Sequence, residues 1–294
     1  MDQYLTQFLE GLREQRRYAD NTIAAYTNDL HQFWAYLSAA QGGPISWAAV
    51  TPEQLAGYVA GLQGGSQSLA ASTVARRVAA VKAYFAHLLG RGVITADPSK
   101  ELSAPKIKKV APKALSAEEI ERLLAAPGRS GSAKSLRDRA LLELLYATGM
   151  RVSEITSLRL DDVDWEAGEI TCPGRGDRQR RLPLGSAAEA LAEYLHRGRP
   201  TFVRDTSPVT LFLNQRGQRL TRQGIWLILR EAATVAGLTD VTPHTLRHSF
   251  ARQQVRAGAG LQQVQKLLGH ANLSTTQMYQ PAASEPGQPA AGEG

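Results

Sequence analysis

The chain has 294 residues, of which 43% are hydrophobic, and it carries a formal net charge of +7. This length predicts about two domains, since a domain takes roughly 100–200 residues, and the basic excess favours a polyanionic partner. The single cysteine excludes an internal disulfide framework and a multi-cysteine metal site. The sequence shows no signal-peptide pattern and no uninterrupted run of ~18 apolar residues. We therefore expect a cytoplasmic protein that does not enter a membrane.

Residues 1–103 are predicted to form an all-helical domain. Apolar residues recur at helical spacing over 23–37, 51–62 and 72–88, with glycine and proline between these runs. A basic helix in such a domain can follow DNA phosphates. The last of the three helices carries the candidate residues for this contact, which are Arg76, Arg77 and Lys82. A solvated helix face is the alternative interpretation.

Residues 104–114 differ abruptly in composition from their neighbours. Their sequence, APKIKKVAPKA, combines prolines with lysines and predicts an extended basic linker between two domains. Further candidates for contact with a DNA backbone are Lys106, Lys108 and Lys109. Ordinary solubility is the alternative explanation for these charges.

The second domain is expected to span 115–281 and to be mixed α/β. A capping-box pattern at Ser116 begins its first helix, and the mostly apolar stretch 135–148 predicts a buried helix. Arg151 follows a glycine break and begins a short helix in which Glu154 can steady it. Arg151 is therefore a candidate functional group at the end of an element, and an ordinary surface pair with Glu154 is the alternative.

Between 163 and 184 the apolar pattern changes to period two, which predicts three short antiparallel strands. The turn between the last two strands has Arg175 at its tip, between two glycines that permit positive φ. Arg178 stands close by in the sequence. The turn lacks the GxxxxGK[ST] spacing of a nucleotide-binding loop. A mobile basic hairpin that reaches a nucleic-acid groove is the better-supported interpretation.

The end of this domain gathers two candidate imidazoles, His244 and His270, with the guanidinium of Arg247 and the phenol of Tyr279. Helical spacing places His244, Arg247 and His248 on one face of a helix. The next helix ends at a glycine just before His270, and a short third helix carries Tyr279. The guanidinium offers a planar fork for a phosphodiester. The phenol can act as a nucleophile and the imidazoles can move protons near neutral pH, so this set indicates phosphate chemistry.

Two other chemistries fit this pattern poorly. His244 and His248 have the spacing of an HExxH zinc helix, but the glutamate is absent and Arg247 stands between them. A Ser-His-Asp hydrolase is disfavoured because no G-x-S-x-G elbow occurs. We therefore expect neither a metal nor a cofactor.

Taken in order, Arg151, the His244-x-x-Arg247 pair, His270 and Tyr279 resemble the tyrosine site-specific recombinases of the phage-integrase family, and most of all the bacterial Xer-type recombinases. The matching segments are NTIAAYTNDL, the basic linker, ATGMRVSEI, the hairpin, TPHTLRHSFA and LLGHANLSTTQMY. The resemblance implies a mainly α fold with a small antiparallel β-sheet. A helical core-binding (SAM-like) domain and a mixed α/β catalytic domain would form a C-shaped clamp around duplex DNA.

The resemblance also implies the chemistry. Tyr279 would attack a phosphodiester, giving a 3′-phosphotyrosyl link and a free 5′-hydroxyl, and rejoining would need no ATP. Arg151 and Arg247 would neutralise the transition state, His270 would donate a hydrogen bond to it, and His244 would assist deprotonation of Tyr279. Exchange would pass through a Holliday junction formed between double-stranded recombination sites. Four protomers would assemble there as a synapse. They would be copies of this chain alone or copies together with a paralogous recombinase. Such enzymes act in chromosome or plasmid dimer resolution, and hence in chromosome partition and cell division, or in element integration.

Two features depart from the family pattern. The hairpin tip usually carries a lysine that protonates the departing 5′-oxygen, whereas arginine, with a pKa of about 12.5–13.8, gives up a proton poorly. Arg175 is nevertheless counted among the catalytic residues, because it can still bind the phosphate. The tail, 282–294, is rich in proline, glycine and small residues, so we expect disorder there rather than an apolar docking helix.

These departures leave two alternatives open. The first is a DNA-binding pseudo-recombinase with weak or no strand exchange, which the hairpin tip and the tail favour and the intact set of reactive groups opposes. The second is a type IB topoisomerase, which relaxes DNA without strand exchange. The two-domain layout disfavours this alternative.

Overall fold

The computed structural model describes residues 3–14, 20–64, 68–105, 114–128, 131–174, 179–270, 272 and 275–279. The chain divides into two compact units, Met1–Val110 and Ala111–Gly294. Both units are mostly helical, and a small antiparallel sheet occurs in the second. The predicted fold class, mainly α with a small antiparallel sheet, is thereby confirmed.

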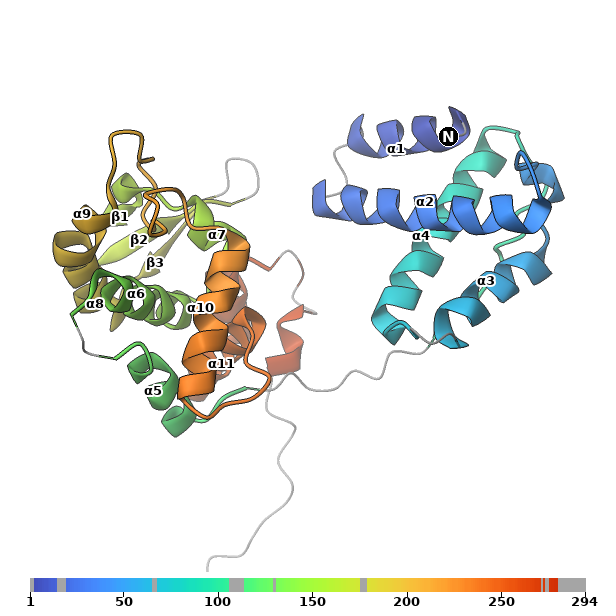
Figure 1. Ribbon diagram of the computed structural model, residues 1–294. Coiled ribbons are helices and arrows are strands. Elements are labelled where there is room, and N and C mark those ends of the chain that lie inside the picture. The colour runs from blue at the N-terminus through green and yellow to red at the C-terminus, as the bar shows by residue number, and fades with distance from the viewer. Residues whose placement is uncertain are drawn as a thin grey trace, which may run out of the picture. The chain divides into compact units, whose positions relative to one another are not determined.

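The N-terminal unit is built from helices that bury one apolar face each. Its elements are α1 (Gln3–Glu14), α2 (Asp20–Gln41), the 3-10 turn η1 (Trp47–Ala49), α3 (Pro52–Gly64) and α4 (Ala71–Gly90). Helix α1 lies along α2 (Figure 1). The apolar stripe of α4 supplies the centre of the core, with Val74, Val78, Val81, Tyr84, Phe85 and Leu88 all buried. The helical spacing of apolar residues predicted α2, α3 and α4.

A buried carboxylate joins two helices of this unit. Asp29 on α2 is 1% exposed and forms ion pairs with Arg76 and Arg77 of α4, the Nε of Arg77 lying 3.6 Å from Oδ1 of Asp29. Burial raises the pKa of Asp29 above its ordinary value, and the two arginines offset part of that rise. Two of the basic α4 residues predicted to contact DNA therefore have an ionic partner inside the unit.

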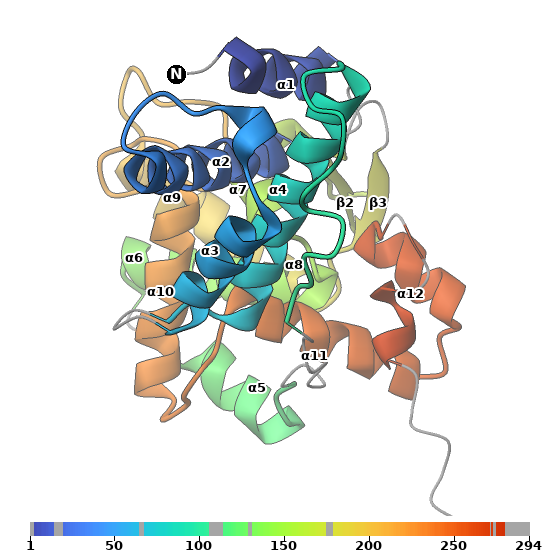
Figure 2. The same cartoon turned by 90° about the vertical axis from the view of Figure 1, so that its right-hand side faces the viewer.

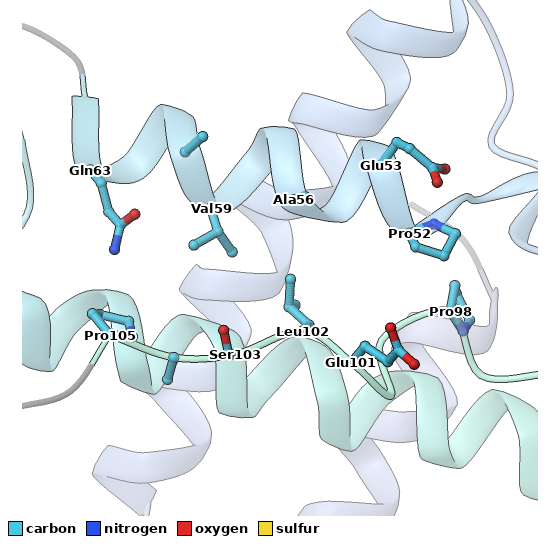
Figure 3. Close-up of a pocket in the computed structure, with 12 residues that line it drawn as sticks. Pro52, Glu53, Ala56, Val59, Gln63, Pro98, Glu101, Leu102, Ser103 and Pro105 are labelled. Carbon is cyan, nitrogen blue, oxygen red and sulfur yellow. The ribbon is translucent and has the colours of Figure 1, made fainter.

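The N-terminal unit also contains a groove of about 500 Å³ between α3 and the segment 98–105 (Figure 3). Apolar side chains such as Val59 and Leu102 line it, and the carboxylates of Glu53 and Glu101 lie near one end. None of the residues that line it is a predicted site residue.

The C-terminal unit combines a helical layer with a three-stranded sheet. Its helices are α5 (Ala117–Ala125), α6 (Ala133–Thr148), α7 (Val152–Ser157), α8 (Ala187–Glu193), α9 (Arg199–Phe202), α10 (Arg222–Val235), α11 (Pro243–Arg256) and α12 (Leu261–Leu268). Shorter turns are η2 (Leu160–Asp162), the π-helical η3 (Tyr194–Gly198) and η5 (Gln277–Tyr279). The strands β1 (Val163–Asp164), β2 (Glu169–Cys172) and β3 (Arg180–Pro183) pair antiparallel in that order, with Ile170 opposite Leu182.

Helix α6 is the central element of this unit. Its mostly apolar sequence is buried along its length, and it contacts α5, α8, α9, α11 and β3 (Figure 1). The Ser132 side chain caps its N-terminus by accepting the N–H of Ser135, and Gly149 ends it in the left-handed region at φ 59°. The buried helix predicted for 135–148 is confirmed, and its C-terminal end fixes where the chain turns toward Arg151.

None of the helices in the described ranges has the length and apolar character that crossing a membrane requires.

Candidate active site

Arg247 lies on the buried face of α11 and is held by two helix ends. Thr242 caps α11 by accepting a backbone N–H from its first turn. Arg247 is 6% exposed, and its Nη1 and Nη2 donate to the carbonyls of Gly149 and Leu268, each at 2.6 Å. These carbonyls belong to the C-terminal ends of α6 and α12, where the helix dipole favours a cation. The guanidinium is therefore fixed by backbone groups.

Glu154 organises two further arginines. The backbone N–H and the Nη1 of Arg151 donate to its carboxylate at 2.7 and 3.0 Å. Arg180 on β3 donates through both Nη atoms to the two carboxylate oxygens, at 3.0 and 2.8 Å. Arg151 also donates to the carbonyl of Gly269, and Arg180 to that of Leu267. Three arginines thus converge on the last turn of α12, which lies beside β3 (Figure 2).

The cluster carries an excess of positive charge. Burial, and then the neighbouring Arg151, lower the pKa of Arg247 to about 10, so it stays protonated at neutral pH. Burial alone would raise the pKa of Glu154, but hydrogen bonds from Arg180 and from the backbone of Arg151 bring it below its ordinary value. A single ionised carboxylate therefore faces three guanidinium groups, which suits the region to an anionic ligand such as a phosphodiester.

His270 follows directly on the glycine that ends α12. Its Nδ1 lies 2.9 Å from the hydroxyl of Thr276, and Gln265 donates to its carbonyl at 3.1 Å. Burial, together with the charges of Arg247 and Arg151, lowers the pKa of His270 to about 4. The imidazole is therefore neutral at pH 7. When the hydroxyl of Thr276 donates to Nδ1, the neutral ring carries its proton on Nε2, and that atom can donate to a ligand.

Tyr279 is buried, and its hydroxyl contacts a histidine. It is 6% exposed and packs with apolar residues of α11 and α12. The hydroxyl forms a short hydrogen bond with Nδ1 of His248, and the two rings are tilted by 50° with centroids 5.4 Å apart. Burial raises the pKa of Tyr279 above its ordinary value, and Arg247 offsets part of that rise. The phenol is therefore protonated at neutral pH.

This arrangement brings a phenol and an imidazole beside an arginine cluster. Comparison with known protein families shows that two family models match the chain. The model described as "Phage integrase family" matches residues 113–285, and "Phage integrase, N-terminal SAM-like domain" matches residues 5–92. The chain belongs to the phage integrase family of tyrosine recombinases. The predicted family is confirmed.

Individual relatives of this recombinase agree with the family match. Tyrosine recombinase XerC of Roseiflexus castenholzii is 46% identical over 282 residues, covering 95% of this chain and 88% of the relative. Tyrosine recombinase XerD of Listeria monocytogenes is 39% identical over 282 residues, covering 95% and 94%. The crystal structure of XerH bound to its difH substrate in a pre-cleavage complex has a TM-score of 0.70 at 26% identity, covering 94% of this chain and 81% of XerH.

The recombinase fold brings together several of the predicted catalytic residues. Contacts around the end of α12 link Arg151, Arg247 and His270, and Tyr279 joins them through its packing on α11 and α12. His244 is exposed in the first turn of α11. Several other candidates lie outside the described residues, namely Arg175, Arg178, Lys106, Lys108 and Lys109. Their roles stay predictions, as does that of Lys82, whose Nζ donates to the carbonyl of Lys100.

Three residues of this region were not selected from the sequence as site residues. His248 shares a helix face with Arg247, and this spacing was its only signal. Arg180 stands in a basic run on the hairpin, where nothing distinguishes it from its neighbours. Glu154 was predicted to steady Arg151, and the structure shows that it holds Arg180 as well. Within the described ranges, no cluster of histidine, cysteine or acidic residues is arranged to hold a metal ion.

Gly149→Ala is expected to lower the free energy of unfolding of the C-terminal unit by about 3 kcal/mol. The added Cβ would lie 2.4 Å from Cδ1 of Phe250, at a backbone φ of 59° that disfavours side chains. Cleavage should also slow, because the Gly149 carbonyl holds Arg247. Gly168→Ala is the matched control, since it has φ 65° but open space, and it should cost about 1–2 kcal/mol. If chemical denaturation showed the same loss of unfolding free energy in Gly149→Ala and Gly168→Ala, the predicted clash with Phe250 would be contradicted.

His270→Gln is expected to make the recombinase less sensitive to acid. The pKa of His270 is about 4 in the folded chain and about 6.5 when unfolded. The unfolded chain therefore takes up this proton first, and the unfolding free energy falls as pH drops from about 6.5 to 4. Chemical denaturation at pH 7 and pH 5 should show a smaller loss in His270→Gln than in the wild type. His196→Gln, which removes an exposed histidine, is the control. The same loss in His270→Gln and wild type would refute the prediction.

Proposed function

We propose that this recombinase cleaves and rejoins duplex DNA at a specific site through a 3′-phosphotyrosyl intermediate. The observation that carries the proposal is a tyrosine with a histidine at its hydroxyl, beside three arginines and a neutral imidazole at the end of α12. Further support comes from XerH, which is similar along 94% of this chain and whose structure contains its difH substrate.

In the proposed reaction the hydroxyl oxygen of Tyr279 attacks phosphorus and the bond to the 5′-oxygen breaks. Negative charge gathers on the non-bridging oxygens, where Arg151 and Arg247 neutralise it and His270 donates a hydrogen bond. Losing one such contact would slow cleavage by roughly 10²–10³. Arg175 is proposed to contact the same phosphate, and the family resemblance assigns His244 to deprotonation of Tyr279. The phosphotyrosyl link is an ester like the bond it replaces, so attack by a 5′-hydroxyl restores DNA without ATP.

Exchange between two duplexes requires a cut in each of four strands, and each chain carries one Tyr279. We therefore infer that four protomers act together on two recombination sites and that a Holliday junction forms between the two pairs of cuts. A paralogous recombinase can supply two of the four. The proposed backbone contacts are Arg76, Arg77, Lys82, Lys106, Lys108, Lys109 and Arg178.

The proposed role is resolution of chromosome or plasmid dimers in the cytoplasm. Identities of 46% and 39% to the XerC and XerD relatives, each over 95% of the chain, support it over element integration.

The proposal is tested by covalent capture. Purified protein is incubated with fragmented, nicked genomic DNA of its source, and adducts that survive denaturation are isolated and sequenced. We expect an adduct at one sequence, absent in Tyr279→Phe. DNA binding without any adduct would refute the proposal and favour a pseudo-recombinase. Relaxation of supercoiled DNA without exchange would favour a topoisomerase.

A further inference from the structure

The nucleophile proposed above has a proton acceptor already in contact with it. Nδ1 of His248 forms a short hydrogen bond with the hydroxyl of Tyr279. A catalytic base must lie within hydrogen-bond reach of the proton it removes, and His248 meets that condition. His244, the histidine that the family resemblance implied for this step, is exposed one turn earlier on α11. Among the described residues, the phenol hydroxyl contacts His248.

We propose that His248 is the catalytic base that accepts the phenol proton of Tyr279 as the tyrosine attacks DNA. This inference rests on the proposed function. The Oη–H bond of Tyr279 breaks and its proton moves to Nδ1 of His248, while Oη forms a bond to phosphorus. The bond from phosphorus to the 5′-oxygen breaks, and that oxygen takes a proton from the acid at the hairpin or from water. The step requires no oxidant, reductant or cofactor.

The environment of His248 suits this role. Burial, and then the nearby His244 and Arg247, lower the pKa of His248 below its ordinary value. Its imidazole is therefore neutral at pH 7 and has a free lone pair for a proton. A buried phenol loses its proton with difficulty, because its pKa lies above the ordinary value of about 10. Direct contact with a neutral imidazole, beside the positive charge of Arg247, supplies both an acceptor and stabilisation of the phenolate.

The backbone that carries His248 is anchored on both sides. Arg247 holds the carbonyls of Gly149 and Leu268. Ser249 accepts the N–H of Leu115 at 2.9 Å through its hydroxyl, which in turn donates to a carbonyl of the preceding turn at 2.9 Å. Neither anchor involves the imidazole itself. His248 can therefore be replaced with little expected effect on the position of α11.

The first experiment is carried out without DNA, on the wild-type protein and on Tyr279→Phe, both of which retain His248. The ¹⁵N chemical shifts of the imidazole nitrogens are measured at neutral pH in the full chain, with His248→Gln used only to assign the signal. We expect an unprotonated Nδ1 whose shift changes in Tyr279→Phe. A proton on Nδ1, or no change in Tyr279→Phe, would overturn the proposal. This result stands whether or not the protein cleaves DNA, so it separates failure of this inference from failure of the proposed function.

The second experiment measures adduct formation by His248→Gln, at saturating protein, on nicked sites with either a 5′-oxygen or a bridging 5′-sulfur leaving group. A sulfur leaves without a proton, so this substrate compensates for a lost acid but not for a lost base. We expect a roughly 10²-fold slower rate on both substrates, with His196→Gln unchanged. A wild-type rate on either substrate would overturn the assignment of His248 as the base.

Discussion

Glu154→Gln is expected to lower the free energy of unfolding of the C-terminal unit by about 3–5 kcal/mol. Glu154 is 9% exposed, and its carboxylate accepts hydrogen bonds from Arg151 and from both Nη atoms of Arg180. Glutamine preserves its size but removes its charge, and the amide NH₂ would face donors of Arg180. The largely buried guanidinium of Arg180, whose side chain is 15% exposed, would lose its ionic partner and would face the more exposed guanidinium of Arg151 without compensation. Hydrogen exchange of α6 under increasing denaturant measures the loss.

The same change should slow DNA cleavage by roughly 10²-fold, because Arg151 loses the side chain that orients it toward the phosphate. Glu169→Gln is the matched control. Its pair with Arg181 spans 3.7 Å with side chains 36% and 66% exposed, and such pairs contribute about 1 kcal/mol or less. If both variants lost equal stability, Glu154 would be no more than a surface partner of Arg151.

Arg175→Lys is expected to accelerate cleavage of a nicked suicide substrate by roughly tenfold or more. Arg175 lies outside the described residues, so this prediction rests on the sequence and on proton chemistry. A lysine with a pKa near 10.4 can give a proton to the departing 5′-oxygen, whereas arginine retains its proton almost always. Cleavage rates are compared by quenched-flow gel analysis of the covalent adduct.

The leaving group provides the control for this prediction. On a site with a bridging 5′-sulfur, the departing atom needs no proton, and Arg175→Lys should give no gain. Arg197→Lys, at a side chain that is 64% exposed and paired with Glu193, should leave both rates unchanged. Absence of any gain on the oxygen substrate would show that Arg175 does not handicap the enzyme and that another group serves as the acid.

Local signals in the sequence determined much of this protein. The capping residues Ser116 and Thr242 and the helix-ending Gly149 act through their own neighbours in the chain, so the ends of α5, α6 and α11 could be predicted. The order of the reactive groups identified the family, which the comparisons confirm. These features depend on contacts within a few residues or on composition, and both can be read without knowledge of the fold.

Only the tertiary structure decided which side chains meet. Helical spacing places His244 and His248 on one face, but the packing of η5 against α11 and α12 brings Tyr279 to His248. Likewise, the placement of β3 beside α12 brings Arg180 to Glu154. Such pairings depend on how segments far apart in the chain pack around α6 and α12. A periodic pattern defines the face of a helix, and the neighbour it meets is set by the packing of the whole unit.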